Sequence, residues 1–128
     1  MGEEMSSVEE SERRIAEIFG IEEGEELPDV TEETLEIYYL HLIENLSFPF
    51  DAEYSVETAP LKDTYYDIKV TGLLEPEECV DLGFYGLFCK GRRGRRKIEI
   101  PLAEIEVKQE GRNKQLVEDY CLWFWNYR

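Results

Sequence analysis

The apolar pattern of this chain changes its period at residues 48–50, which read Phe-Pro-Phe. Before this point, apolar residues recur every three or four positions, as in an amphipathic helix; they are Leu35, Tyr38, Tyr39, Leu42, Ile43 and Leu46. After it, polar and apolar residues alternate, as in a strand. Proline cannot continue a helix. The sequence therefore predicts a helix from a cap at Asp29 or Thr31, a corner at Pro49, and a strand over residues 51–57.

The predicted strand carries oxygen-bearing side chains along one face: Asp51, Glu53, Ser55 and Glu57. Such a face is either a solvated outer surface or a place that collects a hard cation, since Ca²⁺ prefers oxygen ligands. If the strand pairs with the next one, residues 64–71, with apolar faces matched, then Glu57 lies opposite Tyr65, Ser55 opposite Asp67, and Glu53 opposite Lys69. In that register Glu53 has a cationic neighbour, and Asp51 is the freer ligand.

The chain has 128 residues, enough for one domain, and a formal net charge of -16. This charge disfavours nucleic acid and anionic membranes and favours cations or basic proteins as partners. No apolar run reaches the length of a membrane span, and we expect no signal peptide. Cys79, Cys89 and Cys121 are odd in number and lack zinc-site spacing, which favours a reducing cytoplasm.

The other patterns predict an α+β fold. A short helix over residues 8–19 ends at Gly20. Further strands are predicted over 64–71, 82–90, 96–102 and 105–108, with the turn of a hairpin at residues 91–94, and a last helix begins at a cap on Asn113. We expect a small twisted barrel or sheet of about five antiparallel strands, flanked by N-terminal and C-terminal helices. Residues 1–30 are expected to form an acidic extension, and residues 31–128 the main domain.

A second acidic cluster lies on the proline-containing loop after the second predicted strand. It consists of Glu75, Glu77, Glu78 and Asp81. Mobile carboxylates and loop carbonyls suit Ca²⁺, although an ordinary acidic turn would look the same. The chain contains no EF-hand loop.

The region around the predicted hairpin turn is basic. Six of the fourteen Lys and Arg residues lie between positions 90 and 97. In an acidic chain, this cluster indicates a solvated turn or a contact with an acidic surface rather than nucleic-acid binding. His41 is the only histidine, and no catalytic constellation can be identified, so we predict that the protein is not an enzyme.

Several segments together resemble the small cyanobacterial-type calcium-binding proteins of the CcbP family. The specific parts are the Phe-Pro-Phe element at 48–50 and the Val-Glu-Asp-Tyr run at 117–120. Residues 70–79, 100–106 and 115–123 follow the same order, and the resemblance covers about residues 33–127.

The resemblance implies a bacterial calcium-binding domain outside the EF-hand design, which acts as an intracellular buffer or sensor. Combined with the residue patterns, it predicts Asp51 and Glu53 at one ion, and Glu75, Glu77, Glu78 and Asp81 at a second or shared site. Mg²⁺ is expected to compete, and the protein is expected to be a monomer. The alternative is an acidic interaction module that binds a basic protein without a metal.

Overall fold

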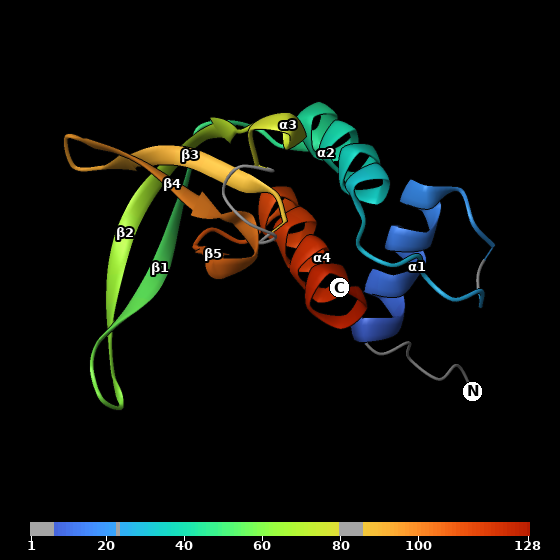
Figure 1. The fold of residues 1–128 in the computed structure, drawn as a ribbon, viewed down its shortest axis with the longest axis horizontal. Helices are drawn as coiled ribbons and strands as arrows, with labels where there is room; N and C mark the ends of the chain where they lie inside the picture. Colours follow the sequence, from blue (N-terminus) through green and yellow to red (C-terminus); the bar gives the residue numbers. More distant parts are fainter. Residues whose placement is uncertain (1–6, 23, 80–85) are drawn as a thin grey trace.

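A computed structural model describes residues 7–22, 24–79 and 86–128. The sheet lies on one side of the molecule and the long helices on the other, with α4 (Arg112–Tyr127) packed between the sheet and α1 (Ser7–Phe19). Figure 1 shows α2 (Glu32–Asn45) beside α4 and the short α3 (Pro76–Cys79) near α2. These layers confirm the predicted α+β fold.

The sheet is antiparallel and open, so a closed barrel is excluded. Its strand order is β4-β3-β2-β1-β5. The strands are β1 (Phe50–Ala59), β2 (Lys62–Leu73), β3 (Phe88–Arg93), β4 (Arg96–Pro101) and β5 (Ile105–Val107). A short 3-10 helix, η2 (Leu102–Glu104), turns the chain between β4 and β5. This turn carries β5 to the far edge of the sheet, where it pairs with β1.

Helix α2 begins with the capping pattern that its sequence predicts. Thr31 is the N-cap, and its side-chain oxygen accepts a hydrogen bond from the backbone N–H of Thr34. Leu35, Tyr38 and Leu42 are buried, whereas Ile43 is 41% exposed. The apolar repeat of residues 35–46 predicts one helix face packed on the core, and the inclusion of Ile43 in that face was therefore wrong. The rings of Phe48 and Phe50 stack at the corner that follows.

The register of the first hairpin differs from the prediction by two residues. Glu53 lies opposite Asp67, Ser55 opposite Tyr65, and Glu57 opposite Asp63. Both strands are longer than expected and leave only Pro60 and Leu61 for the turn. This tight turn, with an irregularity between Glu57 and Ala59, shifts the pairing. Lys69 consequently faces Asp51 and not Glu53.

The second hairpin turns later than predicted. Strand β3 continues through Gly91, Arg92 and Arg93, and the turn is at Gly94 and Arg95. The earlier placement of the turn at residues 91–94 was wrong because Gly91 pairs in two directions, with Val70 and with Ile98. A side chain at position 91 would meet the Lys69 carbonyl oxygen at 2.4 Å, so this close approach requires glycine. Of the predicted strand 82–90, residues 82–85 lie outside the described residues, 88–90 are confirmed, and 86–87 were wrongly included because β3 begins at Phe88.

The helices join the sheet in one apolar core. Ile15 of α1 and Leu42 of α2 are fully buried with Tyr120 and Trp123 of α4, while Trp125 is 49% exposed.

The predicted cap of α4 was wrong, because Gly111 is the N-cap. Asn113 instead accepts a hydrogen bond from the Ser47 N–H and donates one to the Ser47 carbonyl. In the described part of the chain, no helix is long and apolar enough to cross a membrane.

Candidate metal centre

The outer face of the sheet, which is the face away from the core, carries a row of carboxylates across three strands. Glu53 on β1 is paired with Asp67 on β2 and with Glu106 on β5. Residues directly opposite on antiparallel strands have side chains on the same face, and like charges in such pairs repel. Glu53 therefore stands between two other acids. This is an arrangement that a bound cation would stabilise.

The Lys108 side chain lies among these carboxylates. Its ammonium donates a hydrogen bond to the Asp67 carboxylate, and its backbone N–H donates to the Asp51 carbonyl at 3.2 Å. The hydrogen bond to Asp67 raises the pKa of Lys108, and the charges of Asp67, Glu53 and Asp51 raise it further. The negative field of three carboxylates thus converges on one ammonium. We call Asp51, Glu53, Asp67 and Lys108 the Lys108 cluster.

Asp51 lies at the edge of this cluster and beside a second cation. It is exposed and pairs with Lys69 in the register of β1 and β2. Asp51, Asp67, Lys69 and Lys108 all line one concave region of about 510 Å³ on the sheet surface. Of the two carboxylates predicted at the first site, Asp51 therefore lines this region together with Asp67, and Glu53 is the residue opposite Asp67 on β1.

The acids predicted at the second site lie elsewhere, beside α2. Glu75, Glu77 and Glu78 are exposed around the short helix α3. The Glu75 N–H donates to the Glu78 carboxylate at 3.3 Å. Burial raises the pKa of Tyr39 on α2, and the charges of Glu75 and Glu78 raise it further, so these acids stand near that phenol. Asp81 lies outside the described residues.

The carboxylates described for the Lys108 cluster and for the α3 segment do not converge on one point. Within residues 7–22, 24–79 and 86–128, no group of three or more His, Cys, Asp or Glu side chains is arranged to hold a metal ion. In the Lys108 cluster the donor chemistry nevertheless suits Ca²⁺, because all the acidic donors are oxygens and a cation is already drawn to them.

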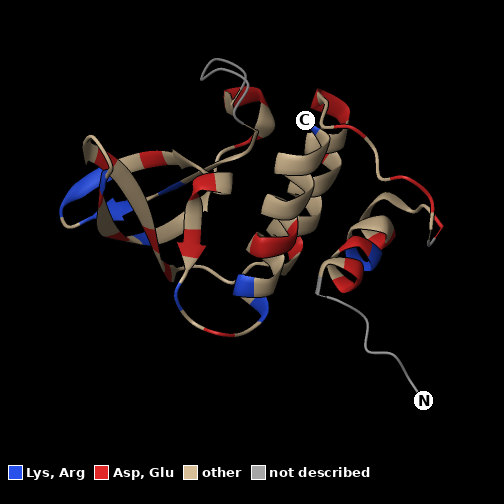
Figure 2. Ribbon diagram, turned by 90° about the horizontal axis from the view of Figure 1, so that it is seen from below, with Lys and Arg blue, Asp and Glu red and all other residues tan. Residues whose placement is uncertain are grey.

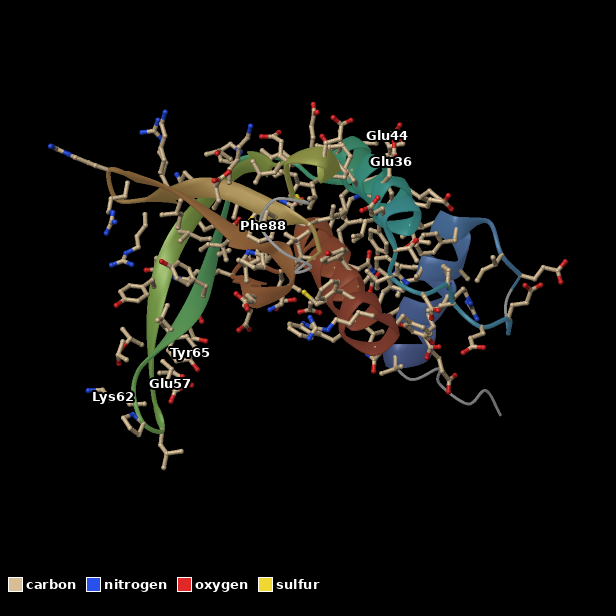
Figure 3. All side chains as sticks on the ribbon, viewed as in Figure 1. Glu36, Glu44, Glu57, Lys62, Tyr65 and Phe88 are labelled. Atoms are coloured by element: carbon tan, nitrogen blue, oxygen red, sulfur yellow. The ribbon has the colours of Figure 1, made fainter. Side chains whose placement is uncertain are left out.

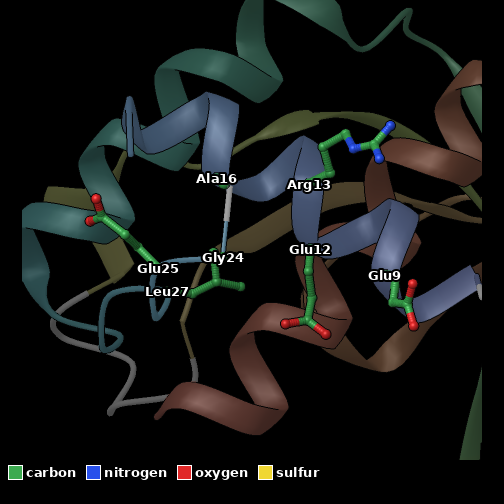
Figure 4. Close-up of a pocket in the computed structure, with 7 residues that line it drawn as sticks. All are labelled: Glu9, Glu12, Arg13, Ala16, Gly24, Glu25 and Leu27. Atoms are coloured by element: carbon green, nitrogen blue, oxygen red, sulfur yellow. The ribbon is translucent and has the colours of Figure 1, made fainter. Parts of the chain in front are cut away.

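A third acidic region lies between α1 and the segment that follows it. Glu9, Glu12 and Glu25 line a cleft of about 220 Å³ together with Arg13 and Leu27. Figure 4 shows the three carboxylates pointing in different directions. Among the residues that the structure describes, this cleft therefore offers no set of converging ligands.

The sequence analysis did not assign three residues around Glu53 to the site: the acids Asp67 and Glu106, and Lys108. Asp67 and Glu106 are on predicted strands, and their alternation with apolar residues marks them as outward-facing. Their approach to Glu53 depends on the register of β1 and β2 and on the placement of β5 beside β1. The missing signal was strand order, which short-range patterns do not contain.

Comparison with known proteins identifies a calcium-binding family. A family model described as calcium binding, that of the CcbP proteins, matches residues 7–124. No curated protein matches at a significant level. The match begins within α1, before the region that first suggested the resemblance.

Two solved structures share the fold. One, a calcium-binding protein in its calcium-binding form, has a TM-score of 0.67 and 21% sequence identity, covering 93% of this chain and 94% of its own. The other, CcbP from Anabaena, has a TM-score of 0.63 and 20% identity, covering 95% of this chain and 93% of its own. These likenesses extend over nearly the whole of each chain.

Proposed function

Because the chain belongs to the CcbP family of calcium-binding proteins, we propose that it binds Ca²⁺ at the outer face of its sheet. Asp51, Glu53 and Asp67 would hold the ion, with Glu106 as a further carboxylate. The observation that carries this proposal is the Lys108 ammonium, which is hydrogen-bonded to Asp67 within the field of Asp51 and Glu53. A lysine drawn to three carboxylates marks the point where a mobile cation is also attracted.

The four residues of the cluster have distinct roles in this proposal. Asp67 exchanges its hydrogen bond with Lys108 for coordination, and the Lys108 side chain, which is 40% exposed, turns to solvent. Asp51 and Glu53 rotate toward the same point from β1. Backbone carbonyls and water complete the six to eight oxygen ligands that Ca²⁺ takes. Because the donors are exposed and mobile, we expect moderate affinity and competition by Mg²⁺.

A second ion at the α3 segment remains part of the proposal. Glu75, Glu77 and Glu78, with Asp81, supply carboxylates on one short stretch of chain. The two regions are separate, so substitutions in one should leave the other intact.

Calorimetric titration of metal-free protein with CaCl₂ tests the proposal. We expect Asp67→Asn and Glu53→Gln each to weaken one site about tenfold or more, because each removes a charged ligand. Glu57→Gln is the matched control, since Glu57 belongs to the same strand but lies toward the far end of the hairpin (Figure 3). Glu77→Gln/Glu78→Gln reports on the second region. No calcium binding by the unsubstituted protein would contradict the proposal.

We further propose that the protein is a cytoplasmic monomer that buffers or senses calcium and catalyses no reaction. The free thiols of Cys79, Cys89 and Cys121 fit a reducing compartment. The family is described by binding and not by a reaction. The acidic body disfavours nucleic acid and anionic membranes as partners. Buffering and sensing differ in whether calcium moves the helices, which small-angle scattering with and without Ca²⁺ would distinguish.

The second candidate function, docking of a basic protein, has one observation in its favour. Ile37 and Leu40 on α2 are 44% and 54% exposed, and Figure 3 shows Glu36 and Glu44 on the same helix. An apolar strip flanked by acids fits a basic amphipathic segment. Titration of a basic amphipathic peptide against Leu40→Gln protein tests this. Deletion of residues 1–28 would not be a clean test of docking, because it would also remove Ile15, which is fully buried in the core.

A further inference from the structure

Three cations lie directly opposite one another across three strands. Lys97 on β4 pairs with Arg92 on β3, and Arg92 pairs with Lys69 on β2. Directly paired residues share a face of the sheet, so the three side chains form one row on the outer face. We call Lys69, Arg92 and Lys97 the basic row. Figure 2 shows Lys and Arg gathered on the hairpin of β3 and β4, away from the acidic helices.

The basic row is balanced only in part within the described part of the chain, where Asp51 lies opposite Lys69 on β1. Lys69, Arg92 and Lys97 are exposed, and none of them forms an ion pair with a described residue. Like charges directly opposite in a sheet are destabilising. The sequence contains thirty Asp and Glu residues, yet it places three cations side by side. An external anion would relieve this repulsion.

A groove accompanies the row across β2, β3 and β4. It has a volume of about 490 Å³ and is lined by Thr71, Lys90, Arg92, Lys97 and Glu99, among others. Lys90 adds a fourth cation, which is opposed by Glu99 in the neighbouring strand. On the other face, the Arg93 guanidinium lies 3.7 Å from the centre of the Tyr66 ring and donates to the Tyr54 hydroxyl at 3.2 Å. These contacts hold the hairpin against the sheet.

Strand β4 leaves one edge of the sheet open. It pairs with β3 alone among the described elements, so its other side presents unpaired backbone N–H and C=O groups. Natural proteins often place lysines on such edges to prevent aggregation. That role accounts for Lys97, which is on β4. It does not account for Arg92 or Lys69, which are on internal strands.

From the basic row, the groove and the open edge, we propose that this face binds an acidic segment of another polypeptide in extended conformation. The segment would add to β4 through backbone hydrogen bonds, the mode of strand addition. Its alternate carboxylates would lie next to Lys97 on the face of the row, and the Arg92 guanidinium, one strand further in, can bind a carboxylate through two parallel hydrogen bonds. This inference does not depend on calcium binding.

A polypeptide fits this face better than nucleic acid does. Double-stranded DNA carries one charge per about 1.7 Å of its axis, so a duplex longer than the row would meet the field of a protein with net charge -16. A short acidic segment places its few charges over the row alone. Only a polypeptide can also use the strand-like hydrogen bonds of the β4 edge.

Fluorescence anisotropy with a labelled peptide tests the proposal. The probe is a peptide of about ten residues that alternates Glu and Thr, the length of a long strand. We expect binding at low salt that weakens at about 0.5 M NaCl. Arg92→Glu should weaken binding about tenfold or more, and this variant should fold, because its new carboxylate lies between Lys69 and Lys97. Lys62→Glu, with the same net charge and an exposed position at the other hairpin tip, should change binding less than about twofold.

The same experiment contains the results that would overturn the proposal. Equal losses in Arg92→Glu and Lys62→Glu would show that net charge alone is responsible. Unchanged binding of a peptide N-methylated at alternate residues would rule out strand addition, which requires its N–H groups. Tighter binding of a single-stranded oligonucleotide of equal charge would rule out a polypeptide as the preferred partner. Calcium titration of Arg92→Glu keeps this test separate from the metal proposal, since Arg92 is not among the proposed ligands.

Discussion

Arg14 of α1 and Asp119 of α4 form a bidentate ion pair that joins the N-terminal and C-terminal helices. Arg14 Nε lies 2.7 Å from Asp119 Oδ2, and Arg14 Nη2 lies 3.0 Å from Oδ1. Asp119 is only 4% exposed and is the one buried charged residue in the described part of the chain. The acidic N-terminal helix is therefore tied to the core by one of its few basic residues.

Arg14→Met should lower the free energy of unfolding by about 2–3 kcal/mol, because it leaves the Asp119 carboxylate buried without its cation. This loss is smaller than the loss of about 3–5 kcal/mol that is typical when one partner of a fully buried ion pair is removed, because the Arg14 side chain is 35% exposed. Urea denaturation measures the change. Lys62→Met, at an exposed turn, should change stability by less than about 0.5 kcal/mol. Similar values for both variants would mean that the pair is not a structural tie.

Tyr120→Phe should destabilise the protein by about 1–3 kcal/mol. The Tyr120 hydroxyl accepts a hydrogen bond from the buried Leu87 N–H at 2.8 Å, immediately before β3. Its removal leaves that N–H without a partner in the core. Tyr65→Phe, at a hydroxyl on a side chain that is 63% exposed, provides the control in the same thermal or chemical unfolding assay. If Tyr120→Phe left the free energy of unfolding unchanged, the hydrogen bond from Leu87 would not contribute to stability.

His41 should make folding sensitive to mild acid. Burial lowers the pKa of His41 below its ordinary value of 6.5, and the charge of Arg112 lowers it further. The unfolded chain therefore takes up the proton first, so His41 lowers stability as the pH falls through 6.5 toward the folded pKa. His41→Gln should remove this contribution. The stability of the parent relative to the variant should fall between about pH 7.5 and pH 5.5; a constant difference would contradict the burial argument.

Much of the fold was predictable because its signals are local. These signals involve residues that are close together in the sequence. They are the periodicity and cap of α2, the pattern of the short helix α1, and the alternation of polar and apolar residues in β1 and β2. The metal-site residues were harder because their neighbours are set by non-local pairing. A two-residue turn at Pro60 and Leu61 moved Asp67 opposite Glu53, and the turn at η2 brought Glu106 and Lys108 to β1. Neither event leaves a mark in the sequence pattern of β1.

Lys108→Met should strengthen calcium binding several-fold at low salt. The ammonium competes with the ion for Asp67 and adds a like charge at the site. The gain should shrink as salt screens the charge. Lys114→Met on α4, which removes an equal charge from the pair with Glu110, controls for the change in net charge. If calcium affinity were equal in the two variants, Lys108 would not occupy the calcium site.

The most direct test of the proposed site is a ¹H–¹⁵N correlation spectrum of the metal-free protein during titration with CaCl₂. The proposal predicts that the largest saturable shifts fall on residues 51–53, 67 and 106–108, on three adjacent strands, and that they disappear in Asp67→Asn. A smaller set at residues 75–79 would report the second region. Saturable shifts at residues 75–79 with none on β1, β2 or β5 would contradict the placement of calcium at the Lys108 cluster.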